Sequence, residues 1–519
     1  MRYKALTGTI GAVTLIFMFA FLPPFAVGLI YGEDTVLLYK TFLVPFFITF
    51  AVAASLYFFG RFELETVRER EAVVAVALAW LLIAFLGSLP YVFSGMLPSL
   101  ADAFFESMSG FATCGATVID PPVIGYTAEG AEIFGDYLDY KNAHSIFFWR
   151  SLTQWVGGMG IIVFSVVIIS KLLGGTVQLF KAETAGESVT RIRPKIQQTA
   201  SILLKIYFLF TAVQTMLLWG AGMPLYDALN HSFTTLATGG FGTRSSSIAF
   251  WNSPAVEAIV ITFMILGSIS FVLHYKILSG NIKALLKDPE LRLFFFSLVF
   301  FTFFITMTLW LKGSADNLEA LALGEYRPME LGKALRFASF NAISIHTTTG
   351  YANYDYGLWP QSAQLALVVM MLIGGCVGST AGAIKLSRIL ILAKVARREV
   401  HKVLHPRAFI PIRLGDTVVQ EEIVRRIGVF FFAYLGVFFV STLIMTLFID
   451  NISVALSSVA TTMGGVGPGI GTGEGTLGPS QTFSFIPGAG KVYLALCMWA
   501  GRLEIFSAII LFFPSTYKD

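Results

Sequence analysis

Charged residues are scarce in this sequence. Asp, Glu, Lys and Arg make up 13% of its 519 residues, whereas 55% are hydrophobic. Soluble domains carry about 25% charged residues, so the composition excludes an ordinary soluble protein and predicts a chain embedded in lipid. Cysteine is scarce as well, and all three copies lie in or beside apolar segments: Cys114, Cys376 and Cys497. An odd number of cysteines in such places argues against a disulfide framework.

The motifs of common enzymes are also missing. The sequence has no Walker A motif, and no nucleophile with a base or pair of carboxylates falls at matching depth in the apolar segments. GEGTLG at 473–478 matches a dinucleotide-binding pattern, but no strand precedes it, so we interpret it as a turn. His401 and His405 lie one helical turn apart and supply too few ligands for a metal site. We therefore predict no enzymatic activity and no cofactor; a membrane-embedded enzyme or sensor is the remote alternative.

Long apolar runs, in contrast, are abundant. A helix needs about 20 apolar residues to cross a bilayer, and ten segments are expected to do so: 5–30, 38–60, 72–97, 145–173, 198–221, 252–279, 290–312, 361–395, 421–449 and 490–514. The first is too long for the apolar core of a signal peptide, so we expect a retained span. Lys and Arg concentrate on the N-terminal side of these spans, and the positive-inside rule then places both termini in the cytoplasm.

A short pattern that runs from an alanine to a glycine occurs four times, each copy between two of the later spans. The copies are Ala103–Gly115, Ala228–Gly240, Ala338–Gly350 and Ala455–Gly467. A threonine stands two residues before the glycine in the first three copies (Thr113, Thr238, Thr348), and Gly465 holds that place in the fourth. The repetition predicts two leading helices followed by four units, each a helix, a half-helix, a small-residue loop and a helix.

The size of the repeated segment suggests its chemistry. About ten residues of helix cross only half of the hydrocarbon, so the chain must turn back at that depth. Non-helical backbone there must be buried in protein or line a water-filled cavity. Small residues leave their carbonyl groups unshielded, and four such strands on one axis would form rings of oxygens that can replace the water shell of a cation. The pattern therefore predicts a cation filter built from backbone.

These segments resemble the Trk/Ktr/HKT superfamily of cation transporters, and most of all its Trk-type potassium-uptake membrane subunits (TrkH/TrkG type). The stretches that carry the likeness are SGFATCGATV, TLATGGFGT, SIHTTTGY, TMGGVGPGIG and GGCVGSTAGAIK. The resemblance implies an all-α membrane protein: two N-terminal helices and four helix–pore-helix–filter-loop–helix repeats around a central pore. We expect the divisions 1–66 (leading helices), 67–180, 181–282, 283–400 (with a gating loop) and 401–519.

The resemblance also implies a potassium filter with one key glycine in each repeat. Backbone carbonyls of the filter strands would bind the ion, and the expected filter residues are Thr113, Cys114, Gly115, Thr238, Gly239, Gly240, Thr348, Thr349, Gly350, Gly465, Val466 and Gly467. In the family, serine at the first glycine accompanies sodium preference in part of the plant branch, so four glycines imply potassium. The family commonly has asparagine where Gly465 stands. This departure keeps a sodium or weakly selective cation transporter as the alternative.

A second set of residues is predicted to gate the pore. GGCVGSTAGAIK (374–385) interrupts the segment 361–395, and its spacing fits either unwound backbone or close packing of helices. The resemblance implies an intramembrane loop that obstructs the pore beneath the filter. Arg502 lies near the middle of the last span, where an arginine must face protein or water; it either faces the pore or forms a structural ion pair. The expected gate residues are Gly374, Gly375, Gly378, Ser379, Thr380, Gly382, Lys385 and Arg502, although Lys385 also suits a snorkelling role.

Charges outside the spans suggest partners. Segment 386–426 is rich in Lys and Arg, which suits the positive-inside rule or contact with anionic lipid. The resemblance implies a homodimer in the prokaryotic inner membrane and a cytoplasmic nucleotide-binding regulatory subunit of TrkA type on this face. Asp102, Glu106 and Asp227 are interpreted as cation attractors at the outer mouth or, for the aspartates, as caps of the half-helices. Channel and symport mechanisms both stay open.

Overall fold

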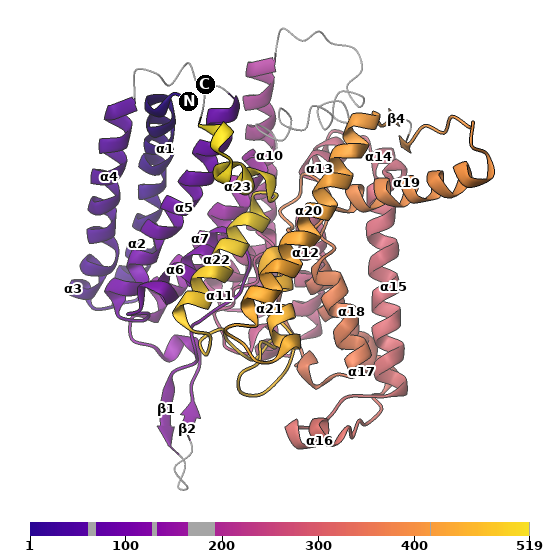
Figure 1. Cartoon of the computed structure of the whole chain (residues 1–519). Helices are drawn as coiled ribbons and strands as arrows, with labels where there is room; N and C mark the ends of the chain where they lie inside the picture. The colour runs from indigo at the N-terminus through magenta and orange to yellow at the C-terminus, as the bar shows by residue number, and fades with distance from the viewer. Residues whose placement is uncertain (61–68, 127–131, 165–191, 416, 518–519) are drawn as a thin grey trace.

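The computed structural model describes the chain except for residues 61–68, 127–131, 165–191, 416 and 518–519. Helices dominate the described part, and most of them run roughly side by side (Figure 1). The strands form two short antiparallel hairpins, β1 (Val123–Tyr126) with β2 (Glu132–Phe134) and β3 (Arg413–Leu414) with β4 (Thr417–Val418). Both termini lie at one end of the molecule, and the β1–β2 hairpin lies at the opposite end, which we call the mouth face (Figure 1).

Two leading spans pack closely against each other. The first contains α1 (Tyr3–Phe17) and α2 (Leu22–Ile30), and the second contains α3 (Thr35–Leu38) and α4 (Val44–Gly60). Glycines allow the close approach of α1 and α4: a Cβ on Gly11 would lie 2.3 Å from the backbone nitrogen of Tyr57, and a Cβ on Gly60 would lie 2.0 Å from the carbonyl oxygen of Lys4. Small residues at such contacts let helix backbones meet in a membrane.

Each of the four repeats then contributes helices around a short half-helix. The first repeat has α5 (Glu69–Ser94), the half-helix α6 (Leu100–Phe111) and α7 (Ala143–Phe164). The second has α10 (Ile192–Gly220), the half-helix α11 (Leu225–Leu236), α12 (Pro254–Ser268) and α13 (Phe271–Leu278). The third has α15 (Pro289–Leu311), the half-helix α17 (Leu331–His346), α18 (Gln361–Met371) and α19 (Leu386–Leu404). The fourth has α20 (Glu421–Met445), the half-helix α21 (Ile452–Gly464), α22 (Gly488–Arg502) and α23 (Phe506–Ile509).

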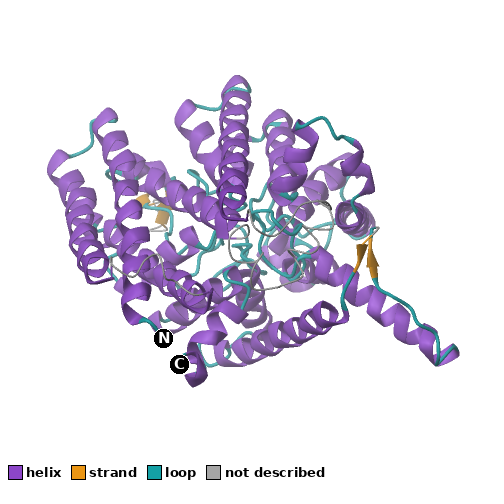
Figure 2. Cartoon of the chain, turned by 90° about the horizontal axis from the view of Figure 1, so that it is seen from above, coloured by secondary structure: helices purple, strands orange, loops and turns teal. Residues whose placement is uncertain are grey.

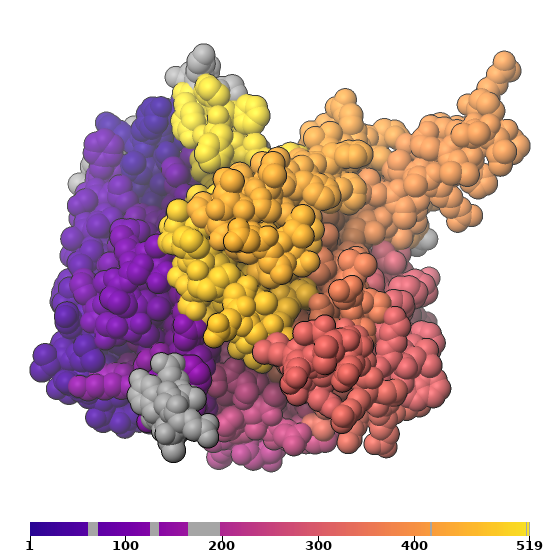
Figure 3. Space-filling view, turned by 60° about the horizontal axis from the view of Figure 1, so that its bottom comes forward, coloured from indigo at the N-terminus to yellow at the C-terminus, as the bar shows by residue number. Residues whose placement is uncertain are grey.

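Short helices α14 (Lys283–Lys287) and α16 (Leu318–Leu323) complete the helical elements of the third region. Viewed along the spans, the helices surround a central region occupied by loops (Figure 2). On the mouth side, the fourth repeat, in orange and yellow, lies between the first repeat and the third (Figure 3). The expected all-α membrane fold with two leading helices and four pore repeats is therefore confirmed.

The expectation of ten continuous spans is wrong in detail. Six helical segments of the described chain are long and apolar enough to cross a membrane on their own. The expected spans 252–279 and 490–514 are instead broken: α12 and α13 meet at 102°, and α22 and α23 meet at 115°. Segment 361–395 is interrupted where the sequence predicted it: the short α18 is followed by a loop and then by the start of α19. The predicted end of span 145–173 beyond Phe164 lies outside the described residues.

Two different features end α12 and α22 at these breaks: contacts with another repeat and left-handed backbone. At the first break, the carbonyl of Ser268 accepts from the backbone N–H of Cys376 (2.9 Å), and Phe271 N–H donates to the carbonyl of Gly378 (3.0 Å). The helix therefore ends where its backbone groups bind the loop of the third repeat. At the second break, Glu504 and Ile505 have φ angles of 58° and 52°, a left-handed conformation that stops an α-helix.

Two of the four half-helices, α6 and α21, begin at a side-chain cap, and neither cap is one of the expected aspartates. Ser99 accepts the N–H of Asp102 at the start of α6 (3.5 Å), whereas the carboxylate of Asp102 pairs with Lys491 (2.7 Å). The start of α11 has no side-chain cap, and Asp227 pairs with Arg244 (3.2 Å). The capping interpretation of these two aspartates is therefore wrong.

Candidate functional site

The four repeated loops meet in a closed ring. In every repeat, the glycine that ends the pattern lies against the carbonyl group just before the glycine of the next repeat, and the fourth repeat contacts the first. A Cβ added to each glycine would meet that oxygen at the following distances: Gly115 to Gly239 O, 2.2 Å; Gly240 to Thr349 O, 1.8 Å; Gly350 to Val466 O, 1.9 Å; Gly467 to Cys114 O, 2.8 Å. Any side chain at these positions would push neighbouring strands apart.

Along each strand of the ring, residues with positive φ angles alternate with a residue of negative φ. The four glycines have φ angles of 86°, 75°, 82° and 114° in chain order, and glycine adopts this region without steric cost. The residues two places earlier are also left-handed, with φ of 51° at Thr113, 52° at Thr238 and 57° at Thr348. The residue between each pair has an ordinary negative φ. When residues of positive and negative φ alternate in this way, successive carbonyl groups of a strand point toward the same side.

Gly465 keeps this geometry in the fourth strand. Its φ of 70° matches the left-handed conformation of the three threonines at the same place, and a Cβ there would lie 3.9 Å from the nearest atom, the carbonyl oxygen of Thr113. Glycine and asparagine are the residues that most readily adopt this conformation. The departure from the family pattern therefore leaves the backbone of the fourth strand unchanged.

No acidic cluster contributes to the ring. Within the part of the chain that the structure describes, no group of three or more His, Cys, Asp or Glu side chains could hold a metal ion. The threonine hydroxyls near the ring are buried, and Thr238 donates to the carbonyl of Ala237 (2.7 Å). The expected filter residues of all four repeats are thus brought together.

The expected gate segment lies directly behind this ring. Residues 372–385 form an irregular loop whose two ends pair at Ile373 and Ile384. The backbone N–H of Gly382 donates to the hydroxyl of Thr348, in the ring strand of the third repeat (2.8 Å). The hydroxyl of Thr380 donates to the carbonyl of Leu236, at the end of half-helix α11 (2.8 Å). The segment is therefore unwound backbone in contact with the ring, and it is not a closely packed helix.

Glycines make the path of this loop possible. A Cβ on Gly374 would lie 1.9 Å from Gly382 O, and a Cβ on Gly382 would lie 2.2 Å from Gly464 O in the fourth repeat. A Cβ on Gly375 would lie 2.8 Å from the oxygen of Ser268, and Gly378 has a φ of 77°. Ser379 plays a local part, since its hydroxyl donates to the carbonyl of Cys376 in the same loop (2.6 Å).

Two buried cations bind carbonyl groups of the loop, Arg502 from α22 and Lys385 from the end of the loop itself. Arg502 donates from Nη1 to the carbonyl of Thr380 (2.7 Å), and its Nε and Nη2 have no hydrogen-bond partner among the described residues. Lys385 donates from Nζ to the carbonyl of Ala381, so it binds the loop and does not snorkel. Glu504 pairs with Arg388. The structural ion pair that was the alternative for Arg502 is absent from the described part of the chain.

The chain matches a known protein family over most of its length. The family model described as "TrkH: Cation transport protein" matches residues 39–517. The chain belongs to the TrkH family. It is 34% identical over 524 residues to the Trk system potassium uptake protein TrkH of Salmonella typhimurium, across 100% of both chains. It is 29% identical over 514 residues to the Trk system potassium uptake protein TrkG of Escherichia coli, across 98% of this chain and 97% of that one.

A solved structure is similar over the whole length. The crystal structure of the potassium transporter TrkH from Vibrio parahaemolyticus matches with a TM-score of 0.84 and 32% identity, and the match covers 100% of both chains. The resemblance found in the sequence motifs is thereby confirmed. The chain is a multi-pass membrane protein of a transporter family.

A cavity of about 60 Å³ opens onto the ring in this TrkH-family chain. Its lining includes all four ring glycines together with Arg150 and Arg244. Neither arginine is an unpaired cation: Arg150 pairs with Glu106 (2.6 Å), and Arg244 pairs with Asp136 (3.1 Å) and Asp227 (3.2 Å). Burial works to lower the pKa of Arg244, but these aspartates outweigh it and raise the pKa.

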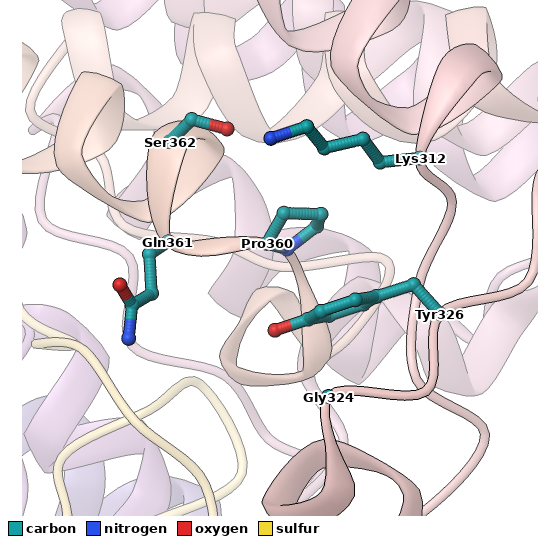
Figure 4. A pocket seen from close by; sticks show the side chains of 6 residues that line it. All are labelled: Lys312, Gly324, Tyr326, Pro360, Gln361 and Ser362. Carbon is teal, nitrogen blue, oxygen red and sulfur yellow. The ribbon is translucent and has the colours of Figure 1, made fainter.

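The three acidic residues that the sequence suggested as cation attractors bind arginine or lysine side chains instead. Asp102, Glu106 and Asp227 are all paired, and none of them lines the cavity. Their interpretation as free cation attractors is wrong. A second cavity of about 600 Å³ lies away from the ring; its lining residues are Lys312, Gly324, Tyr326, Pro360, Gln361 and Ser362 (Figure 4). It shares no residue with the ring.

Sequence reasoning missed the side chains that hold the ring in place. Gln154 on α7 hydrogen-bonds to the second filter strand, and Arg150, one turn earlier, donates to the carbonyl of Gly242 (3.0 Å). Tyr351, which follows the third ring glycine, hydrogen-bonds with the hydroxyl of Thr234 on α11 (2.5 Å). A signal was present for the first two residues, because polar side chains four apart in an apolar helix are costly in lipid unless they are paired.

Proposed function

We propose that this TrkH-family chain takes up potassium across the prokaryotic inner membrane, with both termini in the cytoplasm. Two of its relatives, which match over nearly their whole length, are named potassium uptake proteins, and Lys and Arg concentrate on the side of the termini. The positive-inside rule supports this orientation. The mouth face then faces the exterior, and potassium is the substrate.

The closed ring of four glycine-ended strands is the observation that carries the proposal. We assign the filter to the backbone carbonyls of residues 113–115, 238–240, 348–350 and 465–467. A ring of carbonyl oxygens replaces the hydration shell of a potassium ion, and the half-helices aim the negative ends of their dipoles at the ring. The left-handed φ of Gly465 supports a fourth strand equivalent to the others, so this residue lends no support to sodium transport.

We assign the closed gate to the loop 374–385 together with Arg502. The loop contacts the second and third repeats through hydrogen bonds and the fourth through Gly382, so it crosses the path behind the ring. Arg502 and Lys385 add positive charge at the same depth. Since an unpaired buried cation repels another cation strongly where little water is present, both side chains oppose the passage of potassium until the loop moves.

We further propose a homodimer with a TrkA-type nucleotide-binding regulatory subunit. The exposed arm formed by α19 and the residues after it extends away from the helical body (Figures 1 and 3). Apolar side chains on it are exposed, including Val403 (81%) and Phe409 (92%), and basic residues surround them. The five divisions expected from the sequence stay a proposal, and two of their boundaries, 66/67 and 180/181, lie outside the described residues.

Ion flux in liposomes tests the potassium filter. The purified chain is reconstituted, and potassium and sodium uptake are compared for the wild type and for Gly115→Ser. The wild type should prefer potassium. The variant should lose much of the preference, because a Cβ at Gly115 lies 2.2 Å from Gly239 O. Gly436→Ser is the matched control, since a Cβ at this exposed glycine of α20 has no atom within 4 Å.

The gate gives the same assay a second arm. If the wild type is closed without its regulatory subunit, Arg502→Ala should raise potassium flux while the ratio of potassium to sodium stays the same. Equal flux of both ions through the wild type contradicts the potassium filter. Absence of flux in both the wild type and Arg502→Ala contradicts the assigned pathway.

A further inference from the structure

One side chain of the first repeat holds the second filter strand from behind. Gln154 on α7 donates from Nε2 to the carbonyl oxygen of Gly239 (2.8 Å). Its Oε1 accepts the backbone N–H of Phe241 (3.1 Å). The two hydrogen bonds lie on either side of Gly240, the glycine of this strand, and the Gln154 side chain has no solvent exposure.

The carboxamide of Gln154 is complementary to both backbone groups that it binds. A glutamine side chain carries a donor and an acceptor side by side, and the backbone here presents an acceptor and a donor in the matching order. The reversed orientation would bring two oxygens together at Gly239 and two N–H groups together at Phe241, so the hydrogen bonds fix the orientation of the amide. A leucine could fill the same space but would leave both backbone groups without a partner.

The bound carbonyl is also the one that sets the spacing of the ring. A Cβ on Gly115 would lie 2.2 Å from Gly239 O, and a Cβ on Gly239 would lie 2.4 Å from Cδ of Gln154. Gly239 O is therefore confined between the first filter strand and α7. If Gln154 released this oxygen, the second strand could rotate its peptide group and change the distance to the first strand.

A neighbouring contact extends the support along the same strand. Arg150, one turn before Gln154, donates to the carbonyl of Gly242 (3.0 Å), and its guanidinium lies 3.5 Å from the centre of the Phe241 ring. Glu106 fixes Arg150 through an ion pair. Together α7 contacts residues 239, 241 and 242, which places the strand on a rigid element.

We infer that Gln154 is a positioning residue for ion selectivity: its two hydrogen bonds hold Gly239 O and Phe241 N so that the second strand keeps the width that favours potassium over sodium. This inference rests on the proposed function of the ring. It assigns part of the selection of potassium over sodium to a residue outside the repeated motifs. It also makes the geometry of the second strand dependent on a side chain of the first repeat.

Two variants test the inference in the reconstituted full chain, with the potassium-to-sodium permeability ratio as the readout. Gln154→Leu removes both hydrogen bonds and should lower the ratio about tenfold. In Gln154→Glu, the protonated acid can still donate to Gly239 and accept from Phe241, whereas the ionised carboxylate repels the Gly239 carbonyl. Because burial raises the pKa of a carboxyl group, this variant should be selective at about pH 5 and lose selectivity toward about pH 9.

A control variant and the pH profile of the wild type separate a positioning role of Gln154 from a general effect on folding. Gln214→Leu on α10 is the matched control, since Gln214 is equally buried and both of its polar atoms have no partner among the described residues. Titratable groups lie near the same helix and strand: Arg150 with its partner Glu106, Tyr207 on α10, which donates to the carbonyl of Trp155, and His231 on α11, which lies beside Gly242. All are present in the wild type. The wild-type ratio over the same pH range therefore corrects for their titration.

The outcomes are distinct. A wild type without potassium preference overturns the proposed function. A selective wild type, with Gln154→Glu equally selective at both ends of the pH range, overturns the role of Gln154 alone, even if Gln154→Leu fails to fold. Loss of selectivity in Gln154→Glu at high pH, restored by acidification, supports the positioning role, because a purely structural defect would not follow protonation of that one side chain.

Discussion

The buried pair of Glu106 and Arg150 provides a sharp test of how the ring is supported. Their side chains lie 2.6 Å apart and are 0% and 3% exposed. Removal of one member of a buried ion pair costs about 3–5 kcal/mol, because the other charge stays buried without compensation. In Arg150→Met, Glu106 still accepts the N–H of Val118 (2.9 Å) and the hydroxyl of Thr117 (3.0 Å). We therefore expect a loss near the lower limit, about 3 kcal/mol.

Equilibrium unfolding of the purified chain in bicelles measures this loss. Arg327→Met is the matched control, because Arg327 pairs with Asp316 at a similar distance (2.8 Å) but the two side chains are 83% and 52% exposed. An exposed pair contributes about 0–1 kcal/mol. The double variant Glu106→Gln/Arg150→Met should recover part of the loss, since it removes the uncompensated charge. Equal losses for Arg150→Met and Arg327→Met would refute the reasoning that burial decides the magnitude.

Three further predictions concern the gate, the fourth strand and the leading helices. Replacement of Arg502 by lysine should shift the loop, because one point charge cannot keep the planar geometry of the hydrogen bond to Thr380; single-channel recording should show a higher open probability than in the wild type. Gly465→Asn should keep the potassium-to-sodium ratio in liposomes, because asparagine tolerates the left-handed backbone, whereas Gly465→Val should lower it. Gly60→Ala should lower the free energy of unfolding by about 1–3 kcal/mol through overpacking, whereas Gly220→Ala, with open space around its Cβ, should not lower it.

The repeated motifs were the most informative part of the sequence for the fold. A glycine at the same place in four copies predicted four equivalent loops, and the distances from Gly115, Gly240, Gly350 and Gly467 to the neighbouring strands show why: each needs the absence of a side chain. Physical constraints on short half-helices in lipid then predicted that the loops meet. The sequence also indicated the unwound segment at 374–385, because its glycines interrupt an apolar run.

The bends of the second and fourth repeats could not be predicted in the same way. The breaks fall at residues 268–270 and 502–505, which include serine and charged residues. Such residues also occur inside continuous helices, as Ser297 does in α15 and Arg150 in α7, so they do not by themselves predict a bend. These helices end because of contacts with segments distant in sequence, such as the hydrogen bonds of Ser268 and Phe271 to the loop 372–385. The supporting role of Gln154 is long-range as well, since its partners lie 85 and 87 residues away.

The closed ring has a consequence for how this protein can change. A tetrameric channel that is built from identical subunits repeats every substitution four times, so no side of its pore can vary alone. Here a single gene encodes four quadrants, and a substitution such as Gly465 alters one of them. Different side chains also support the quadrants: Gln154 binds the strand of the second quadrant, and Tyr351 holds the strand of the third. Ion preference can therefore be tuned in small, one-sided steps.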